Sequence, residues 1–314
     1  MDSLLYRGEE FDANFYYASK VDIDHSFFVV CGKERMLFVP RLNEKRARKE
    51  FDGKVAVYTK ISDIAAQLGR RTYCVDGYSL PYSLFEKLSK KINLKDAAQK
   101  FQAARMKKTK EQVELIRKAV KITKSILKNL DFSEFDTEQD VRAHLLSETF
   151  ERGLEPAFQP IVATGKNSSM PHYTPSNTKL KDYVLVDYGV RYKHYCADLT
   201  RCFFLKRDKK KEETDRILKQ IVSEIVDELP TFNVAKELVA FSDKLFKKYK
   251  LPPQIHAIGH GIGLGVHEAP HLGKKSKDSL KDTVLAIEPG VYYKDFGARC
   301  EENVYYDGKR ARRL

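Results

Sequence analysis

The chain has 314 residues and a formal net charge of +13 at pH 7, from 57 Lys and Arg against 44 Asp and Glu. That length is sufficient for one large or two ordinary domains with a buried core. No apolar run is long enough to cross a membrane, and acidic residues within positions 1–10 stand where a signal peptide needs an apolar region. We therefore expect a cytoplasmic protein without a membrane partner.

A net positive charge can indicate a nucleic-acid partner. Here the basic residues are interleaved with acidic ones, and no nucleic-acid-binding motif accompanies them. We interpret these segments as solvated helix faces and turns, so we do not expect nucleic acid to bind. The basic segments are residues 41–49, 87–110, 206–211 and 244–250.

Residues 1–104 are predicted to form a small α/β domain. Short runs rich in β-branched and aromatic residues alternate there with Lys-rich helical stretches. Because the pattern changes near residue 105, a second domain is predicted over 105–314. The predicted strands of the first domain span residues 24–30, 35–39, 54–58 and 72–76.

The second domain begins with a predicted long helix. Thr109 and Gln112 have the spacing of a capping box, and an apolar stripe with helical periodicity follows them. The stripe consists of Val113, Ile116, Val120, Ile126, Leu127 and Leu130. Further helices are predicted over about 137–152, 210–228 and 234–249.

Two carboxylate pairs are the most informative feature of the sequence. Asp187 and Asp198 flank the turn of one predicted β-hairpin, and Glu288 and Glu301 flank the turn of another. If each turn closes at its centre, the carboxylates of a pair face each other with Cβ atoms about 4.5–5.5 Å apart, where like charges repel. Cations would neutralise them, so the pattern predicts a site for more than one metal ion. The predicted turn centres are Tyr192–Lys193 and Lys294–Asp295.

Surface carboxylates beside hairpin turns are the alternative interpretation of these pairs. Two matching pairs, each within an apolar run, argue against it, and a histidine adds a further ligand. His260 is flanked by Gly259 and Gly261, which allow close backbone approach and leave room for an ion. One neutral imidazole among oxygen ligands suits Mn, Co, Fe or Zn.

Five motifs, in this order, resemble the pita-bread metallopeptidases, the family of methionine aminopeptidase, aminopeptidase P and prolidase. The resemblance is strong over residues 105–314 and weaker before them, where the chain resembles the creatinase-like N-terminal domain of prolidase and aminopeptidase P. It implies an α/β (α+β) protein in which a small α/β domain precedes a pita-bread catalytic domain. The motifs are VDYG (186–189), ADLTR (197–201), GHGIG (259–263), IEPG (287–290) and RCEEN (299–303).

The resemblance also implies a role for each ligand. Asp187 would chelate one ion, His260 and Glu288 would hold the other, and Asp198 and Glu301 would bridge both. Glu288 would also act as the general base, taking a proton from water and passing it to the leaving nitrogen.

Four further residues are candidates for contact with the substrate, two of them, His172 and His267, because the resemblance implies it. His267 follows His260 by seven residues, and the resemblance implies that it contacts the substrate carbonyl or the residue after it. It would also stabilise the oxyanion. His172 would lie beside the metals, although a turn histidine after a proline is more often simply exposed. Tyr173 would form an aromatic wall of the pocket. Arg299 would neutralise an active-site carboxylate or bind a substrate carboxylate, with an ordinary salt bridge as the alternative.

Two other sequence features have plainer interpretations. The run from His267 to His271 matches the HExxH signature, but Pro270 and the preceding glycines disfavour the helix that a zincin needs. Cys300 is next to Glu301, yet strand alternation directs it to the opposite face, which favours core packing over metal binding. The five cysteines are odd in number and lack CxxC spacing, which favours reduced thiols.

We therefore predict a dinuclear-metal-dependent Xaa-Pro dipeptidase with two divalent ions per subunit, Mn or Co before Zn or Fe. The separate N-terminal domain favours this proline-directed branch over methionine aminopeptidase. Aminopeptidase P, acting on longer peptides, is the alternative. A non-catalytic peptide- or nucleic-acid-associated binding protein of the same fold is an alternative of another class. The expected partners are a peptide substrate and, as the resemblance implies, a second copy in a homodimer.

Overall fold

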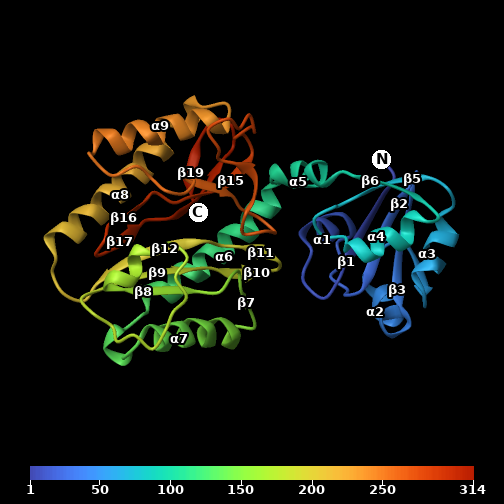
Figure 1. Ribbon diagram of the computed structural model, residues 1–314, viewed down its shortest axis with the longest axis horizontal. Helices are drawn as coiled ribbons and strands as arrows, with labels where there is room; N and C mark the ends of the chain where they lie inside the picture. Colours follow the sequence, from blue (N-terminus) through green and yellow to red (C-terminus); the bar gives the residue numbers. More distant parts are fainter. The chain divides into compact units, whose positions relative to one another are not determined.

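The computed structural model describes residues 1–314, which form two compact units, Met1–Arg105 and Met106–Leu314 (Figure 1). Each unit contains hydrophobic clusters of its own. No helix in either unit is both long enough and apolar enough to span a membrane.

The first unit is built on a six-stranded mixed sheet with apolar side chains on both faces. Along β2, Phe27 and Val29 belong to one buried cluster while Phe28 belongs to the other, because successive side chains of a strand point to opposite faces. In sheet order the strands are β4 (Lys54–Tyr58), β3 (Glu34–Pro40), β2 (Ser26–Cys31), β1 (Ser3–Arg7), β5 (Thr72–Val75) and β6 (Asn93–Asp96).

All four strands predicted for this unit are present, but two more were missed. β1 is a short segment that nevertheless lies between β2 and β5 in the sheet. β6 is a polar strand at the sheet edge, where burial imposes little apolar pattern. The helices of the unit are α1 (Ala13–Ser19), α2 (Glu44–Glu50), α3 (Ile61–Leu68), α4 (Tyr82–Ser89) and α5 (Ala98–Met106), whose last residue begins the second unit.

The second unit repeats one order of elements, two helices followed by a set of strands. The first half contains α6 (Lys110–Lys128), α7 (Glu138–Glu151), β7 (Glu155–Pro156), β8 (Ile161–Thr164), β9 (Tyr183–Tyr188), β10 (Val190–Tyr192), β11 (Tyr195–Cys196) and β12 (Leu199–Phe204). The second contains α8 (Lys209–Glu228), α9 (Ala235–Lys248), β13 (Gly259–Gly261), β14 (Glu268–His271), β15 (Thr283–Ile287), β16 (Gly290–Tyr292), β17 (Gly297–Arg299), β18 (Glu302–Tyr306) and β19 (Ala311–Arg313).

The predicted helices of this unit are confirmed. Thr109 and Gln112 form the capping box at the start of α6, with each side chain accepting a backbone N–H of the other residue. The predicted apolar stripe is buried except for Leu130, which lies beyond the end of the helix. In Figure 1, α8 and α9 lie on one side of the red strands β15 to β19. Their apolar residues form one cluster with Leu285, Ile287 and Val304 of those strands.

The register of the first carboxylate hairpin differs from the prediction by one residue. Asp187 is paired with Thr200, not with Asp198, and the turn is centred on Lys193 and His194. These two residues have φ values of 46° and 70°, as a type I′ hairpin turn requires. Asp198 consequently faces Gly189, between the ladders β9–β12 and β10–β11.

Gly189 explains why this register is tolerated. A Cβ atom at that position would lie 1.8 Å from the carbonyl oxygen of Ala197, so no other residue fits. Asp187 and Asp198 are thereby diagonal neighbours on one face of the hairpin. Diagonal Cβ atoms are about 7–8 Å apart, a smaller repulsion than direct opposition would give.

The second carboxylate hairpin has the predicted register. Ile287 is paired with Glu302 in the ladder β15–β18, and Gly290 is paired with Arg299 in the ladder β16–β17. Counting inward from both ladders places Glu288 directly opposite Glu301. Each predicted long hairpin is therefore interrupted at its carboxylates, where one ladder ends and another begins.

Candidate metal centre

All five predicted ligand residues line one cavity of about 530 Å³. They arrive from the two carboxylate hairpins and from β13, and three further predicted residues also line the cavity. The predicted ligands are Asp187, Asp198, His260, Glu288 and Glu301, and the further residues are His172, His267 and Arg299.

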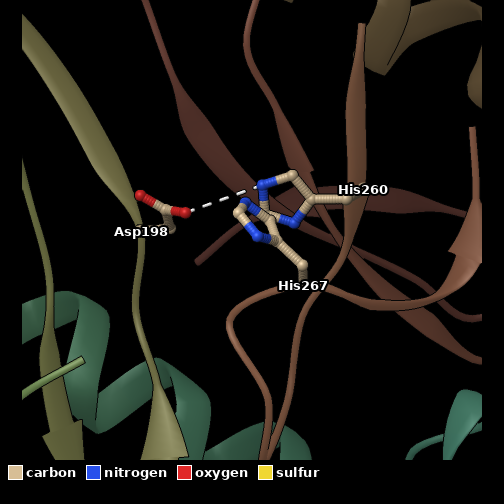
Figure 2. Close-up of side chains that lie close together, drawn as sticks. All are labelled: Asp198, His260 and His267. Carbon is tan, nitrogen blue, oxygen red and sulfur yellow. Dashed lines mark ion pairs between the residues drawn. The ribbon is translucent and has the colours of Figure 1, made fainter. Parts of the chain in front are cut away.

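The ligand atoms form three overlapping groups. One contains Asp187, Asp198 and Glu301, a second contains His260, Glu288 and Glu301, and in each the donor atoms lie within 4.8 Å of one another. The third joins Asp198 and His260 to His267, as Figure 2 shows. Asp198, His260 and Glu301 each belong to two of the groups, so the three groups form one continuous cluster.

His260 is at the centre of the cluster. Its Nε2 lies 3.6 Å from Oδ2 of Asp198, 3.7 Å from Oε1 of Glu288 and 4.0 Å from Oε1 of Glu301. The ring of His267 stands nearly perpendicular to that of His260, with ring centroids 4.1 Å apart (Figure 2).

The short strand β13 brings His260 to the hairpins. It pairs with β15, so that His260 is opposite Ala286, two residues before Glu288. Gly259 is required for this approach, because its φ is 154° and a Cβ atom there would lie 2.0 Å from the carbonyl oxygen of Ala286. Gly259, which precedes His260, therefore allows β13 to lie close against β15.

Arg299 is buried and pairs with Asp187. Its Nη2 donates to Oδ2 of Asp187 across 2.6 Å, its Nε donates to Oγ1 of Thr200 and its Nη1 donates to the hydroxyl of Tyr292. The same Thr200 hydroxyl donates to Oε2 of Glu301 across 2.9 Å. The structure thus shows an ion pair between Arg299 and Asp187, and the substrate-binding role of Arg299 stays a prediction.

Without cations, the charged forms of these carboxylates are disfavoured by burial and by their mutual repulsion. Burial, followed by the charges of neighbouring carboxylates, holds the pKa values of Asp198 and Glu301 well above their ordinary range. Burial raises the pKa of Glu288 to about 7, with Arg299 opposing the rise. Burial also lowers the pKa of His260 to about 3, which keeps the imidazole neutral and able to act as a metal ligand.

The donor set fits divalent metal ions. Oδ1 of Asp187 and Oδ1 of Asp198 are buried without a hydrogen-bond donor, although buried acceptors are normally satisfied. Carboxylate oxygens with one neutral imidazole are ligands that Mn, Co, Fe and Zn accept. Arg299 supplies only one positive charge to this group of carboxylates.

Tyr173 does not have the position that the sequence suggested. His172 lines the cavity, but Tyr173 does not. The Tyr173 hydroxyl instead donates to Oε2 of Glu138 across 2.8 Å. The apolar part of the cavity lining comes from other side chains, including Phe158, Ile161 and Val266.

Sequence reasoning missed His256, which lines the cavity, and its hydrogen-bond partner Tyr292. Nδ1 of His256 lies 3.7 Å from Oε2 of Glu288, and its Nε2 is hydrogen-bonded to the Tyr292 hydroxyl at 2.9 Å. Burial lowers the pKa of His256 to about 4. The only available signal was a spacing of four residues before His260, which is weak for a residue outside any regular element.

The two plainer interpretations of nearby residues agree with the structure. Glu268–His271 is the strand β14, so the HExxH run has no helix. Cys300 is buried in the apolar cluster beneath α8 and α9, on the side away from the ligands. All five cysteines are free thiols.

Two protein-family models and several known proteins match this chain, and together they span nearly all of it. The family model described as metallopeptidase family M24 matches residues 114–307, and that of the creatinase/prolidase N-terminal domain matches residues 6–107. An Xaa-Pro dipeptidase from Pyrococcus furiosus is 30% identical over 313 residues, covering 96% of this chain and 90% of the relative. A putative Xaa-Pro aminopeptidase from Mycoplasma pneumoniae is 27% identical over 323 residues, covering 93% and 87%. The solved structure of a prolidase from Pyrococcus furiosus superimposes with a TM-score of 0.88 at 28% identity, covering 99% of this chain and 95% of that one.

Proposed function

This chain belongs to metallopeptidase family M24, and we propose that within this family it is an Xaa-Pro dipeptidase. Its membership makes it a metal-dependent hydrolase of peptides, of the prolidase and aminopeptidase P type. The predicted creatinase-like α/β domain followed by a pita-bread domain is confirmed by the two family matches. The proposal of proline specificity rests on the cavity, in which the ligand cluster meets an apolar wall.

We assign the metal ligands as the resemblance implied. Asp187 would hold one ion, His260 and Glu288 the other, and Asp198 and Glu301 both. When bound, such ions polarise a carbonyl and lower the pKa of a water molecule toward neutrality.

The chain's own residues then handle protons and developing charge. Glu288 is assigned to take the proton of the attacking water and deliver it to the leaving nitrogen, because its carboxylate lines the cavity 3.7 Å from Nε2 of His260. His267 is exposed to the cavity beside His260 and can donate a hydrogen bond to the oxyanion that forms from the carbonyl. His172 lines the same cavity and is assigned to substrate binding.

The apolar wall supports the proposed specificity for proline. Phe158, Ile161 and Val266 supply apolar surface for a pyrrolidine ring. The proline nitrogen of an Xaa-Pro bond has no hydrogen, so it needs no acceptor. A secondary amide bound in the same place would have an unpaired N–H, which costs about 1–3 kcal/mol.

Hydrolysis of Met-Pro, Met-Ala and Met-Pro-Ala-Ala in the presence of Mn or Co tests the proposal. We expect Met-Pro to be cleaved at least roughly tenfold faster than Met-Ala, as the cost of one unpaired N–H implies. Methionyl-sarcosine, whose peptide nitrogen is methylated but carries no ring, is the matched control. Cleavage of it as fast as Met-Pro would assign the preference to the missing N–H, and slow cleavage would assign it to the ring. Equal rates for Met-Pro and Met-Ala would refute proline specificity.

Two alternatives are decided by the same experiment. Efficient cleavage of Met-Pro-Ala-Ala would favour aminopeptidase P, the activity named for the Mycoplasma relative. The absence of any hydrolysis would favour a non-catalytic binding protein, although the complete ligand cluster weighs against it.

The nature of the ions and the oligomeric state are further parts of the proposal. We propose Mn or Co as the native metal, with Zn or Fe as the next candidates, and a cytoplasmic homodimer. Metal analysis of protein purified without added metal tests the first. Light scattering coupled to size-exclusion chromatography tests the second, because a single mass of 36.2 kDa would contradict a dimer.

A further inference from the structure

A buried carboxylate outside the metal cluster is hydrogen-bonded to both ends of the segment that carries His172. Glu138 begins α7 and has no exposed surface. No hydrogen bond to it comes from a ligand of the cluster, so the metal chemistry does not account for its burial. A buried charge is costly unless hydrogen bonds satisfy it.

Five hydrogen bonds, all from neutral groups, satisfy Glu138. Oε1 accepts from the backbone N of Thr164 at 2.7 Å and from Nδ2 of Asn167 at 2.9 Å. Oε2 accepts from the Tyr173 hydroxyl at 2.8 Å, and from the backbone N and hydroxyl of Ser176 at 3.2 and 3.3 Å. The first turn of a helix further favours a negative charge at this position.

The donors bracket the segment that carries His172. Thr164 ends β8, and Ser176 lies beyond His172, so the carboxylate joins the two ends of the connection. The backbone N of Glu138 donates to Thr178 O at 3.1 Å, which adds a further attachment to α7.

Both sequence neighbours of His172 are thereby anchored. Tyr173 is held through its hydroxyl by Glu138, and Pro171 accepts a hydrogen bond from Nη1 of Arg299 at 3.4 Å. His172 itself is exposed and lines the cavity. Its position therefore depends on contacts made by the residues on either side of it.

We infer that Glu138 is a positioning residue for His172, acting through Tyr173 and the segment 164–178. This inference rests on the proposed substrate-binding role of His172. A charged carboxylate is needed because it accepts on both oxygens, whereas a glutamine would direct an NH2 group at donors on one side.

A double-mutant cycle tests the inference. Glu138→Gln should lower kcat/KM for the best dipeptide by roughly tenfold or more, since buried donors lose their acceptor. Metal content should stay at the wild-type value. In a His172→Ala background the same change should cost less than about twofold, because the residue through which Glu138 acts is already gone. An equal loss in both backgrounds would overturn the inference.

Two further variants keep the test decisive. Tyr173→Phe removes only one of the donors and retains the carboxylate, so it should fold even if Glu138→Gln does not. It should give a smaller loss that also vanishes without His172, and full additivity would contradict the inference. Glu237→Gln is the matched control, because Glu237 accepts from the backbone N of Asn233 and of Val234 at the start of α9. It should leave kcat/KM unchanged.

The inference about Glu138 and the proposed function are refuted by different results. The double-mutant cycle uses whichever dipeptide the wild-type protein cleaves fastest. Equal cleavage of Met-Pro and Met-Ala would therefore refute proline specificity but leave the inference about Glu138 intact. If His172→Ala alone leaves kcat/KM unchanged, the positioning role is refuted, while selective Met-Pro hydrolysis by the wild type would still support the proposed function.

Discussion

The side chain of Asn303 exchanges two hydrogen bonds with the backbone of Asp198. Nδ2 of Asn303 donates to Asp198 O at 2.9 Å, and Asp198 N donates to Oδ1 of Asn303 at 3.0 Å. Asn303 is completely buried in β18, so this amide fastens the first carboxylate hairpin to the second. The position of Asp198 is therefore fixed from the opposite half of the unit.

Replacing Asn303 should weaken both the fold and the metal site. Asn303→Ala leaves a buried N–H and a buried carbonyl of Asp198 without partners, and we expect a loss of about 1–3 kcal/mol in the free energy of unfolding. Metal stoichiometry at limiting metal should fall as well, because Asp198 is released. Denaturant unfolding and metal analysis measure the two effects. Asn129→Ala, at the exposed C-terminal end of α6, is the control.

Neutralising either of the shared carboxylates should abolish turnover. Asp198→Asn and Glu301→Gln each remove a charge from two overlapping groups of donors, so both should lower metal stoichiometry. Glu302→Gln is the matched control, because Glu302 is adjacent in the chain but pairs with Arg201 at 2.6 Å. Wild-type turnover with full metal content in Asp198→Asn or Glu301→Gln would rule out the shared assignment.

Glu288→Gln should separate metal binding from proton transfer. The remaining donors should retain at least one ion, while kcat falls by about 10²–10⁴-fold, the usual contribution of a general acid–base group. Turnover should be measured with metal-saturated protein across a range of pH. A loss smaller than about threefold, well below that contribution, would place the proton-transfer role elsewhere.

Chelation should destabilise the protein more at neutral than at mildly acidic pH. Without ions, the folded-state pKa of Glu288 is about 7, and those of Asp198 and Glu301 are also raised. A raised pKa adds stability that is fully present below the unfolded value, about 4, and is lost as pH rises through the folded value. His256 and His260 remain neutral at both pH values below, because burial lowers their pKa values to about 4 and about 3. Melting curves of metal-loaded and chelated protein at pH 5.5 and 7.5 should show the larger difference at pH 7.5, and equal differences would contradict this account.

The carboxylates of the candidate site could be located from sequence because each hairpin carries its own local signal. Glu288 and Glu301 were placed opposite each other correctly, since apolar alternation defines that hairpin on both sides. For Asp187 and Asp198 the same reasoning chose the wrong turn. Positive φ angles at Lys193 and His194 displace the centre of the hairpin turn by one residue. Neither Lys nor His indicates that conformation in a sequence, as Asn or Gly would.

Contacts between distant segments were beyond the reach of the sequence pattern. The Tyr173 hydroxyl was assigned to the substrate pocket because its partner, Glu138, lies 35 residues away on another element. His256 was overlooked because it belongs to no periodic segment. β6 was missed for a related reason, since a polar edge strand buries too little surface to leave an apolar pattern.

The ligand cluster also constrains how the second unit can fold. Asp187 and its partner Arg299 are 112 residues apart in the sequence, so the centre forms only when both hairpins have come together. Contacts of such long range form late and slow the search for the native state. Ions that bind only this finished arrangement shift the equilibrium toward it by mass action. We therefore expect metal binding to stabilise the completed structure and not to nucleate its folding.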